Sequence, residues 1–240
     1  METAVDLLAI FPHPDDAELG CGGTLAKTAA GGHRVGIVDL ARGEMASRGT
    51  VELRAEEAQR AARVLGASVR ENVGLPDAGL RNDPETREQL ALVIRRLTPK
   101  IVIAPALEGR HPDHRVAAQL VRDACFVAGL AKVAPQVPKH RPLKILHCLT
   151  HRQDFVRPTF VVDISAELTL KLDAIRCYES QFQGLTQAGE VYPNGEPLEA
   201  IIQHHAAYYG SLIRRQYGEP FFTTEMMAVD DIMTLGVSTL

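Results

Sequence analysis

Residues 10–24 read Ile-Phe-Pro-His-Pro-Asp-Asp-Ala-Glu-Leu-Gly-Cys-Gly-Gly-Thr, and the rest of the chain is interpreted outward from them. An apolar run over residues 5–11 predicts a buried strand, and residues 22–30 predict a helix. Open α/β sheets bind ligands at such strand-to-helix turns. The turn carries one imidazole and two carboxylates, those of His13, Asp15 and Asp16, between prolines that restrict the backbone. This stretch therefore predicts a ligand site at the carboxyl end of the first strand.

A second stretch, Arg-His-Pro-Asp-His over residues 110–114, carries the same chemistry. It also follows an apolar run, over residues 101–105, that predicts a strand. A polar turn of His, Pro and Asp is by itself most often only a surface turn. Two such turns at the carboxyl ends of parallel strands can converge above one sheet, so we expect His111 and His114 to lie close to the first turn.

Strands and helices alternate through the first half of the chain, which predicts right-handed crossovers and an α/β fold. The expected architecture is a mostly parallel sheet with helices on both faces and a C-terminal α/β elaboration, within a single domain over residues 1–240. Further strands are expected over residues 34–40, 68–75, 100–105, 143–149 and 158–164, and further helices over 50–65, 83–97, 116–125, 165–178 and 197–218. Residues 179–197 lack periodicity and are interpreted as a long functional loop or lid; the tail from residue 219 has no clear pattern.

Composition excludes several classes of protein. The net charge of −4 argues against nucleic-acid binding, which needs a basic surface. The sequence has neither a secretion signal nor an apolar run long enough to span a membrane, which predicts a cytoplasmic protein. Its 4 cysteines are widely spaced, as expected of buried thiols in a reducing compartment rather than of a disulfide framework or a thiolate cluster.

The two polar turns together supply the ligands of a catalytic metal. A catalytic zinc ion usually takes three protein ligands and keeps one position open, and His13, Asp16 and His114 offer two nitrogens and one oxygen. Asp15 is then free to act as a general base, and a protonated His111 to stabilise an oxyanion. This set of residues predicts a hydrolase.

The motifs His13-Pro-Asp-Asp16, Gly22-Gly-Thr24 and His111-Pro-Asp-His114 resemble those of the LmbE-like (PIG-L) zinc-dependent N-acetylglucosamine deacetylases. Four further stretches, over residues 47–50, 75–77, 178–182 and 217–221, resemble the bacillithiol-pathway branch, which deacetylates N-acetylglucosaminyl-malate. The resemblance implies a Rossmann-like fold and often a homohexamer. It also implies that His13, Asp16 and His114 bind Zn²⁺, with Fe²⁺ as an alternative, that Asp15 is the base, and that His111 polarises the substrate.

A small amino sugar is the expected partner. If it carries a carboxylate, it needs cationic groups, and Arg48, Arg54 and Arg110 lie in loops or a first helical turn that face the predicted site. Tyr192, within the expected lid, is a candidate for a contact to the sugar.

Several alternatives stay open on the sequence alone. Another N-acetylated sugar, such as diacetylchitobiose, is an alternative substrate. A dinucleotide-dependent oxidoreductase would use Gly20 and Gly22 after the strand and Asp39 at the end of the next one, although Leu25 replaces the third glycine. Two histidines and one carboxylate also form the iron site of non-haem oxygenases. A carbohydrate- or metal-binding module without catalytic activity is the last alternative.

Overall fold

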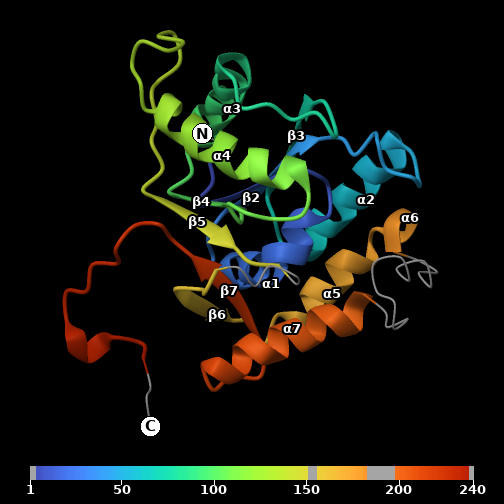
Figure 1. The fold of residues 1–240 in the computed structure, drawn as a ribbon, viewed down its shortest axis with the longest axis vertical. Helices are drawn as coiled ribbons and strands as arrows, with labels where there is room; N and C mark the ends of the chain where they lie inside the picture. Colours follow the sequence, from blue (N-terminus) through green and yellow to red (C-terminus); the bar gives the residue numbers. More distant parts are fainter. Residues whose placement is uncertain (1–3, 151–155, 183–197, 238–240) are drawn as a thin grey trace.

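The structure is a computed structural model that describes residues 4–150, 156–182 and 198–237. A twisted sheet forms its centre and helices cover both faces (Figure 1). The strands are β1 (Leu7–Phe11), β2 (Val35–Ala41), β3 (Val69–Leu75), β4 (Ile101–Pro105), β5 (Lys144–Cys148), β6 (Phe160–Asp163) and β7 (Gly218–Phe222). The helices are α1 (Asp16–Ala30), α2 (Val51–Val64), α3 (Pro84–Leu97), α4 (Pro112–Ala128), α5 (Leu168–Arg176), α6 (Glu179–Phe182), α7 (Leu198–Leu212) and the short 3₁₀ helix η2 (Ile232–Thr234).

The 7 strands lie in the order β3-β2-β1-β4-β5-β7-β6. The first five in this order pair in parallel, and β7 is antiparallel to both of its neighbours. This confirms the predicted α/β class with its mostly parallel sheet. The chain runs outward in one direction from β1 through β2 to β3, then returns to place β4 on the other side of β1. The carboxyl ends of β1 and β4 therefore flank the point where strand order reverses, which is where open α/β sheets bind ligands.

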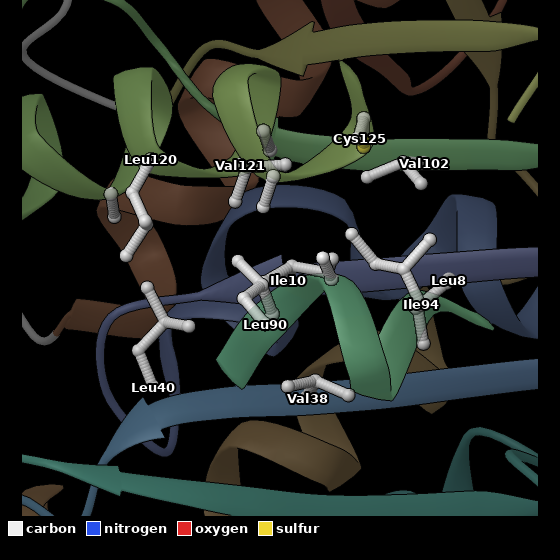
Figure 2. Close-up of a cluster of buried hydrophobic side chains, with 14 of the residues drawn as sticks. Leu8, Ile10, Val38, Leu40, Leu90, Ile94, Val102, Leu120, Val121 and Cys125 are labelled. Carbon is white, nitrogen blue, oxygen red and sulfur yellow. The ribbon is translucent and has the colours of Figure 1, made fainter. Parts of the chain in front are cut away.

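Side-chain alternation along the buried strands produces two apolar cores, one on each face of the sheet. Leu8 and Ile10 of β1 point to the face covered by α3 and α4, where they pack with residues such as Leu90 and Val121 (Figure 2). Leu7, Ala9 and Phe11 point to the opposite face, which α1, α2 and α5 cover. None of the described helices has the length and apolar character needed to cross a membrane.

The C-terminal part of the sheet differs from the sequence-based expectation. The last long helix was expected to run to Gly218, but α7 ends at Leu212 and residues 218–222 form strand β7. This strand inserts between β5 and β6 although it contains Pro220, a residue that seldom occurs in an inner strand. Its ladder is short: only two residue pairs join it to β5. The expected helix over residues 165–178 also begins later, since α5 starts at Leu168.

A buried carboxylate ties β7 to helix α1. Helix α1 kinks at Cys21, which has a φ of −142°, and a kink interrupts the regular hydrogen bonds along a helix. Glu219 accepts hydrogen bonds from the backbone N–H of Gly23 at 2.9 Å and of Thr24 at 2.7 Å. The ammonium of Lys171, on α5, lies 2.7 Å from the same carboxylate. Glu219 therefore caps the second half of α1 and joins it to α5 and β7.

Replacing Glu219 by glutamine should lower the free energy of unfolding. The amide keeps the shape of the side chain but removes the charge that balances Lys171, whose side chain is only 4% exposed. Removing one partner of a buried ion pair costs several kcal/mol, so we expect a loss of about 3 kcal/mol. For a domain of this size that loss corresponds to a fall in Tm of roughly 6–12 °C.

Chemical denaturation measures this effect, with Glu199→Gln as the control. Glu199 pairs with Arg176 in an ion pair open to solvent, whose loss typically costs less than about 1 kcal/mol. Equal losses of stability in the two variants would contradict the role given to Glu219.

Candidate metal centre and active site

The loops after β1 and β4 bring three ligand-type side chains together. His13 Nδ1 lies 3.3 Å from one oxygen of Asp16, and His114 Nε2 lies 3.2 Å from the other. One donor atom from each of the three residues falls within 4.8 Å of the other two. Asp16 begins α1 and His114 lies in the first turn of α4, so two helix starts and the end of β1 fix the positions of the three side chains.

The donor set fits a divalent cation. Two imidazole nitrogens and a carboxylate oxygen are the ligands of many catalytic zinc sites and also suit ferrous iron. The field of the carboxylates favours positive charge at this place: burial alone lowers the pKa of His13, but Asp16, Asp77 and Asp15 outweigh it and raise that pKa to about 9. Burial alone would raise the pKa of Asp16, yet His114 and His13 hold it well below its usual range. The same attraction would act on a metal ion.

The second nitrogen of His13 meets two carboxylates behind the site. His13 Nε2 lies 2.9 Å from Asp77 Oδ1 and 3.4 Å from Asp113 Oδ2. Asp113 also accepts hydrogen bonds from the backbone N–H of Ala78 and Leu80. Such carboxylates fix the tautomer of a ligand histidine, so that Nε2 carries the proton and Nδ1 presents its lone pair.

The sequence did not assign these roles to Asp77 and Asp113. Asp77 was noted only within residues 75–77, a stretch that resembles the bacillithiol-pathway branch, and Asp113 only as part of its motif. A second group of possible donors includes His13, His111 and Asp113. Both oxygens of Asp113 accept backbone N–H groups, whereas a backbone N–H, that of His13, reaches only Oδ2 of Asp16, so we favour the group built on Asp16.

Asp15 has an unusual backbone and a charged partner. Its φ is +109°, a conformation that costs about 1–3 kcal/mol for a residue other than glycine and is concentrated at functional sites. Arg54 Nη2 donates to Asp15 Oδ2 at 2.9 Å and to the carbonyl of Pro14 at 2.6 Å. Burial raises the pKa of Asp15 to about 7, against the opposing charge of Arg54. A carboxylate with a pKa near neutrality suits general base catalysis.

Arg54 was predicted to contact the substrate, and in the structure it binds Asp15 and the carbonyl of Pro14. Its side chain is 7% exposed and its Nη2 is used by Asp15 and Pro14. Arg54 lies in the first turn of helix α2, which points toward the loop after β1. The sequence did not reveal that the guanidinium of Arg54 binds a carboxylate of the protein itself, that of Asp15. We therefore regard it as a positioning residue for Asp15.

His111 lies next to both histidines of the group. Its ring centroid lies 5.0 Å from that of His13 and 5.3 Å from that of His114. His111 Nδ1 accepts the backbone N–H of Asp113 at 3.2 Å, so the proton of a neutral ring lies on Nε2. Burial lowers the pKa of His111, and the charges of His13 and His114 lower it further. The geometry thus favours a neutral imidazole that donates from Nε2, rather than the protonated ring considered from the sequence.

The other predicted substrate contacts lie at the same edge or outside the described residues. Arg110 is exposed and immediately precedes His111 in the loop after β4. Arg48 is exposed in the loop after β2, where its carbonyl accepts a hydrogen bond from Gln181. Tyr192 and most of the expected lid lie outside the described residues; residues 179–182 form α6.

The residues that suggested a dinucleotide site have structural roles instead. Both oxygens of Asp39 accept hydrogen bonds from Arg70 at 2.9 Å, and Asp39 is 2% exposed. A Cβ on Gly20 would lie 2.7 Å from the sulfur of Cys148, and one on Gly22 would lie 3.3 Å from Cγ of Lys171. These glycines allow α1 to pack closely, and Asp39 does not face a ribose site.

Comparison with known proteins agrees with this geometry. A family model described as PIG-L, GlcNAc-PI de-N-acetylase, matches residues 8–125. A diacetylchitobiose deacetylase from Thermococcus kodakarensis is 32% identical over 229 residues, which cover 89% of this chain and 80% of the relative. The chain belongs to the PIG-L (LmbE-like) deacetylase family. This confirms the resemblance drawn from the sequence motifs.

Two further proteins are similar to this family member. The conserved protein TT1542 from Thermus thermophilus superimposes with a TM-score of 0.83 at 40% identity, covering 94% of this chain and 98% of that one. A 4-oxalmesaconate hydratase from Pseudomonas putida is 29% identical over 72% of this chain and 73% of its own length. Because the relatives include a hydratase as well as a deacetylase, the reaction must be argued from the site.

Proposed function

We propose that this protein is a metal-dependent N-deacetylase that releases acetate from an N-acetylglucosamine-type sugar. The observation that carries the proposal is the convergence of His13, Asp16 and His114 within 4.8 Å, with Asp15 next to Asp16 and His111 5.0 Å from His13 between ring centroids. Asp15 is our candidate base and His111 our candidate hydrogen-bond donor, and both adjoin the three metal-type ligands. Family membership and the similarity to a diacetylchitobiose deacetylase support the same reaction.

His13, Asp16 and His114 would hold the metal ion, and zinc is our first choice. Bound there, a divalent ion would act as a Lewis acid and lower the pKa of a water molecule toward neutrality. Asp77 and Asp113 would keep His13 in the tautomer that binds through Nδ1. Ferrous iron suits the same ligands, so metal analysis has to accompany every activity measurement.

In amide hydrolysis, Asp15 transfers protons and His111 stabilises the carbonyl oxygen. Asp15 accepts a proton from the attacking water, and Arg54 holds its carboxylate in place. His111 Nε2 donates a hydrogen bond to the carbonyl oxygen as negative charge develops on it. Asp15 then returns the proton to the leaving nitrogen as the C–N bond breaks. The products are acetate and a free amino sugar.

Two substrates deserve priority. Similarity to the diacetylchitobiose deacetylase favours a chitobiose-type sugar, and the motifs similar to the bacillithiol-pathway branch favour N-acetylglucosaminyl-malate. The decisive experiment measures acetate release by purified, metal-analysed protein on both substrates and on N-acetylglucosamine. Hydration of 4-oxalmesaconate is measured in parallel. Hydration without acetate release would overturn the proposed reaction and assign the protein to the hydratase type.

Arg110 offers a test of the malate alternative. Arginine pairs with carboxylates in a two-pronged geometry, and Arg110 is exposed beside His111. If malate is the aglycone, Arg110→Ala should raise KM for the malate glycoside about tenfold or more and leave KM for N-acetylglucosamine nearly unchanged. Arg63→Ala, on the exposed side of α2, is the control. Equal changes of KM on both substrates would argue against a carboxylate contact by Arg110.

The Asp77→Asn substitution tests whether Asp77 holds His13 in the orientation that binds metal. Asp77 accepts from three donors, His13 Nε2, the backbone N–H of Met45 and that of Ala78, whereas asparagine has only one acceptor oxygen. We expect metal affinity to fall about 10–100-fold, as when other outer partners of metal ligands are removed. Competition with a chelator measures the affinity. Asp123→Asn is the control: this residue lies on α4, its side chain is 47% exposed, and its replacement should leave the metal affinity unaltered. An unaltered metal affinity in Asp77→Asn would contradict the role of Asp77 in orienting His13.

A further inference from the structure

Two stretches of the sequence, residues 47–50 and 178–182, resemble the bacillithiol-pathway branch and have no role in the proposed hydrolysis. The structure brings them into contact, since the side-chain amide of Gln181 donates to the backbone carbonyl of Arg48 at 3.0 Å. The first stretch lies at the end of the loop after β2, residues 42–50 (the β2 loop), and the second contains helix α6. This contact therefore connects the β2 loop to α6.

Buried carboxylates of α1 and α2 hold the residues around α6 in place. Glu57, on α2, is fully buried and accepts the backbone N–H of Ser180 at 2.7 Å and its hydroxyl at 2.6 Å. The hydroxyl of Tyr178 donates to Glu18, on α1, at 2.9 Å. A Cβ on Gly49, where φ is +73°, would lie 2.9 Å from Ser180 Oγ, so glycine is needed for the β2 loop to approach this closely. Residues 178–182 thus form a fixed support for the loop.

The other end of the β2 loop contacts residues that support the active site. Asp77 accepts the backbone N–H of Met45 at 2.9 Å. A Cβ on Gly43, where φ is +77°, would overlap the guanidinium of Arg54, so the backbone of the loop packs directly on this side chain. Asp77 holds a candidate metal ligand and Arg54 holds the candidate base. The β2 loop therefore runs from the supports of the active site to α6.

We propose that the β2 loop binds the part of the substrate that lies beyond the N-acetylated sugar, and that Ser180 and Gln181 are positioning residues that keep the loop in place for this contact. The proposal rests on the proposed function. The scissile amide has to reach the donors at the ends of β1 and β4, and β2 is the neighbour of β1, so a larger substrate extends over the adjoining loop. Every residue of the β2 loop except Gly43 and Ala46 is exposed, and Met45, 68% exposed, offers apolar surface to a sugar ring.

Tryptic cleavage of the folded, full-length protein tests the support of the loop without requiring activity. Trypsin cuts after arginine, and the carbonyl that Gln181 holds belongs to the bond between Arg48 and Gly49. Gln181→Ala removes this donor, and Ser180→Ala removes the hydroxyl that accepts from Gln181 Nε2 at 2.9 Å. Each substitution should speed cleavage at Arg48 about three- to tenfold, because cleavage follows the population of the open loop. Mass spectrometry of the fragments measures this rate.

Gln203→Ala is the matched control. It removes a side-chain amide that donates to the hydroxyl of Tyr217, on α7 and away from the β2 loop, and should leave cleavage at Arg48 unchanged. Unchanged cleavage in both Ser180→Ala and Gln181→Ala would refute their role in positioning the loop.

Kinetics of the combined variant Ser180→Ala/Gln181→Ala test the role of the loop in substrate binding. We expect KM for the larger substrate that the protein turns over, diacetylchitobiose or N-acetylglucosaminyl-malate, to rise at least about threefold. The value of kcat should stay within about twofold, and KM for N-acetylglucosamine should change little. This split is expected because Asp77 and Arg54 still hold the end of the loop that lies near the reacting groups.

The outcomes separate this proposal from the proposed function. Faster cleavage with a rise in KM confined to the larger substrate would support it. Faster cleavage with unchanged KM, or with an equal fall of kcat on both substrates, would refute binding by the β2 loop. A wild-type protein that releases acetate from none of these substrates would overturn the proposed function and the binding role together, whereas the cleavage rates would still decide whether Ser180 and Gln181 position the loop.

Discussion

Replacing His114 by alanine is expected to abolish both metal retention and acetate release. His114 supplies one of three converging donors, and its Nε2 also contacts Asp16. Two remaining ligands hold a metal weakly, and the Lewis acid contributes several kcal/mol to stabilisation of the transition state. Since 1.36 kcal/mol is a factor of ten, we expect kcat/KM to fall by at least about 10³-fold.

Elemental analysis of the purified variant and the acetate-release assay measure the two effects. His33→Ala is the matched control, because its imidazole is 62% exposed and lies outside the site, near Asp6. The control should keep wild-type metal content and activity. A His114→Ala enzyme with full metal content and undiminished turnover would remove His114 from the ligand set and, with it, the proposed centre.

The second large effect is expected for Asp15→Asn, which should lower kcat while the metal stays bound. Asparagine has the shape of aspartate and tolerates a positive φ, so the turn should keep its conformation. It cannot accept a proton from water, and loss of a general base typically costs about 10²–10⁴ in rate. Asp15 is not one of the three converging donors, so metal content should match that of the wild type.

The combination of retained metal and lost turnover distinguishes a base from a ligand. Asp173→Asn, a change at a side chain that is 45% exposed and paired with Arg176, is the control and should alter neither quantity. Loss of metal in Asp15→Asn would mean that Asp15 is a ligand. Unchanged kcat would mean that another group takes the proton from water.

Arg54 and Asp77 are charged residues that position other residues of the site. Both come from loops or helix starts next to the first polar turn, and both contact a residue of that turn. Arg54 holds the candidate base, and Asp77 holds a candidate ligand. The charged residues around the three donors thus keep the donors and the base in fixed orientations, which limits how much the site must reorganise during the reaction.

The sequence by itself determined the class of fold and the meeting of two polar motifs at one edge of the sheet. Apolar runs followed by polar turns predicted the parallel strands, and two motifs placed their histidines at strand ends that had to meet at one edge. The prediction succeeded because each motif stays attached to its own strand, so that sheet topology alone brings His13 and His114 together. These signals are local: a strand, a turn and a helix start can each be recognised within about a dozen residues.

Only the tertiary structure decided which charged groups meet. Glu219 caps α1 from 195 residues away, His13 meets Asp113 across 100 residues, and β7 enters the sheet despite Pro220. No periodicity marks such contacts, since they depend on the directions in which side chains leave elements that are distant in sequence. The contact of Arg54 with Asp15 was not predicted for the same reason: a helix start shows where the residue lies, and packing selects the carboxylate that it binds.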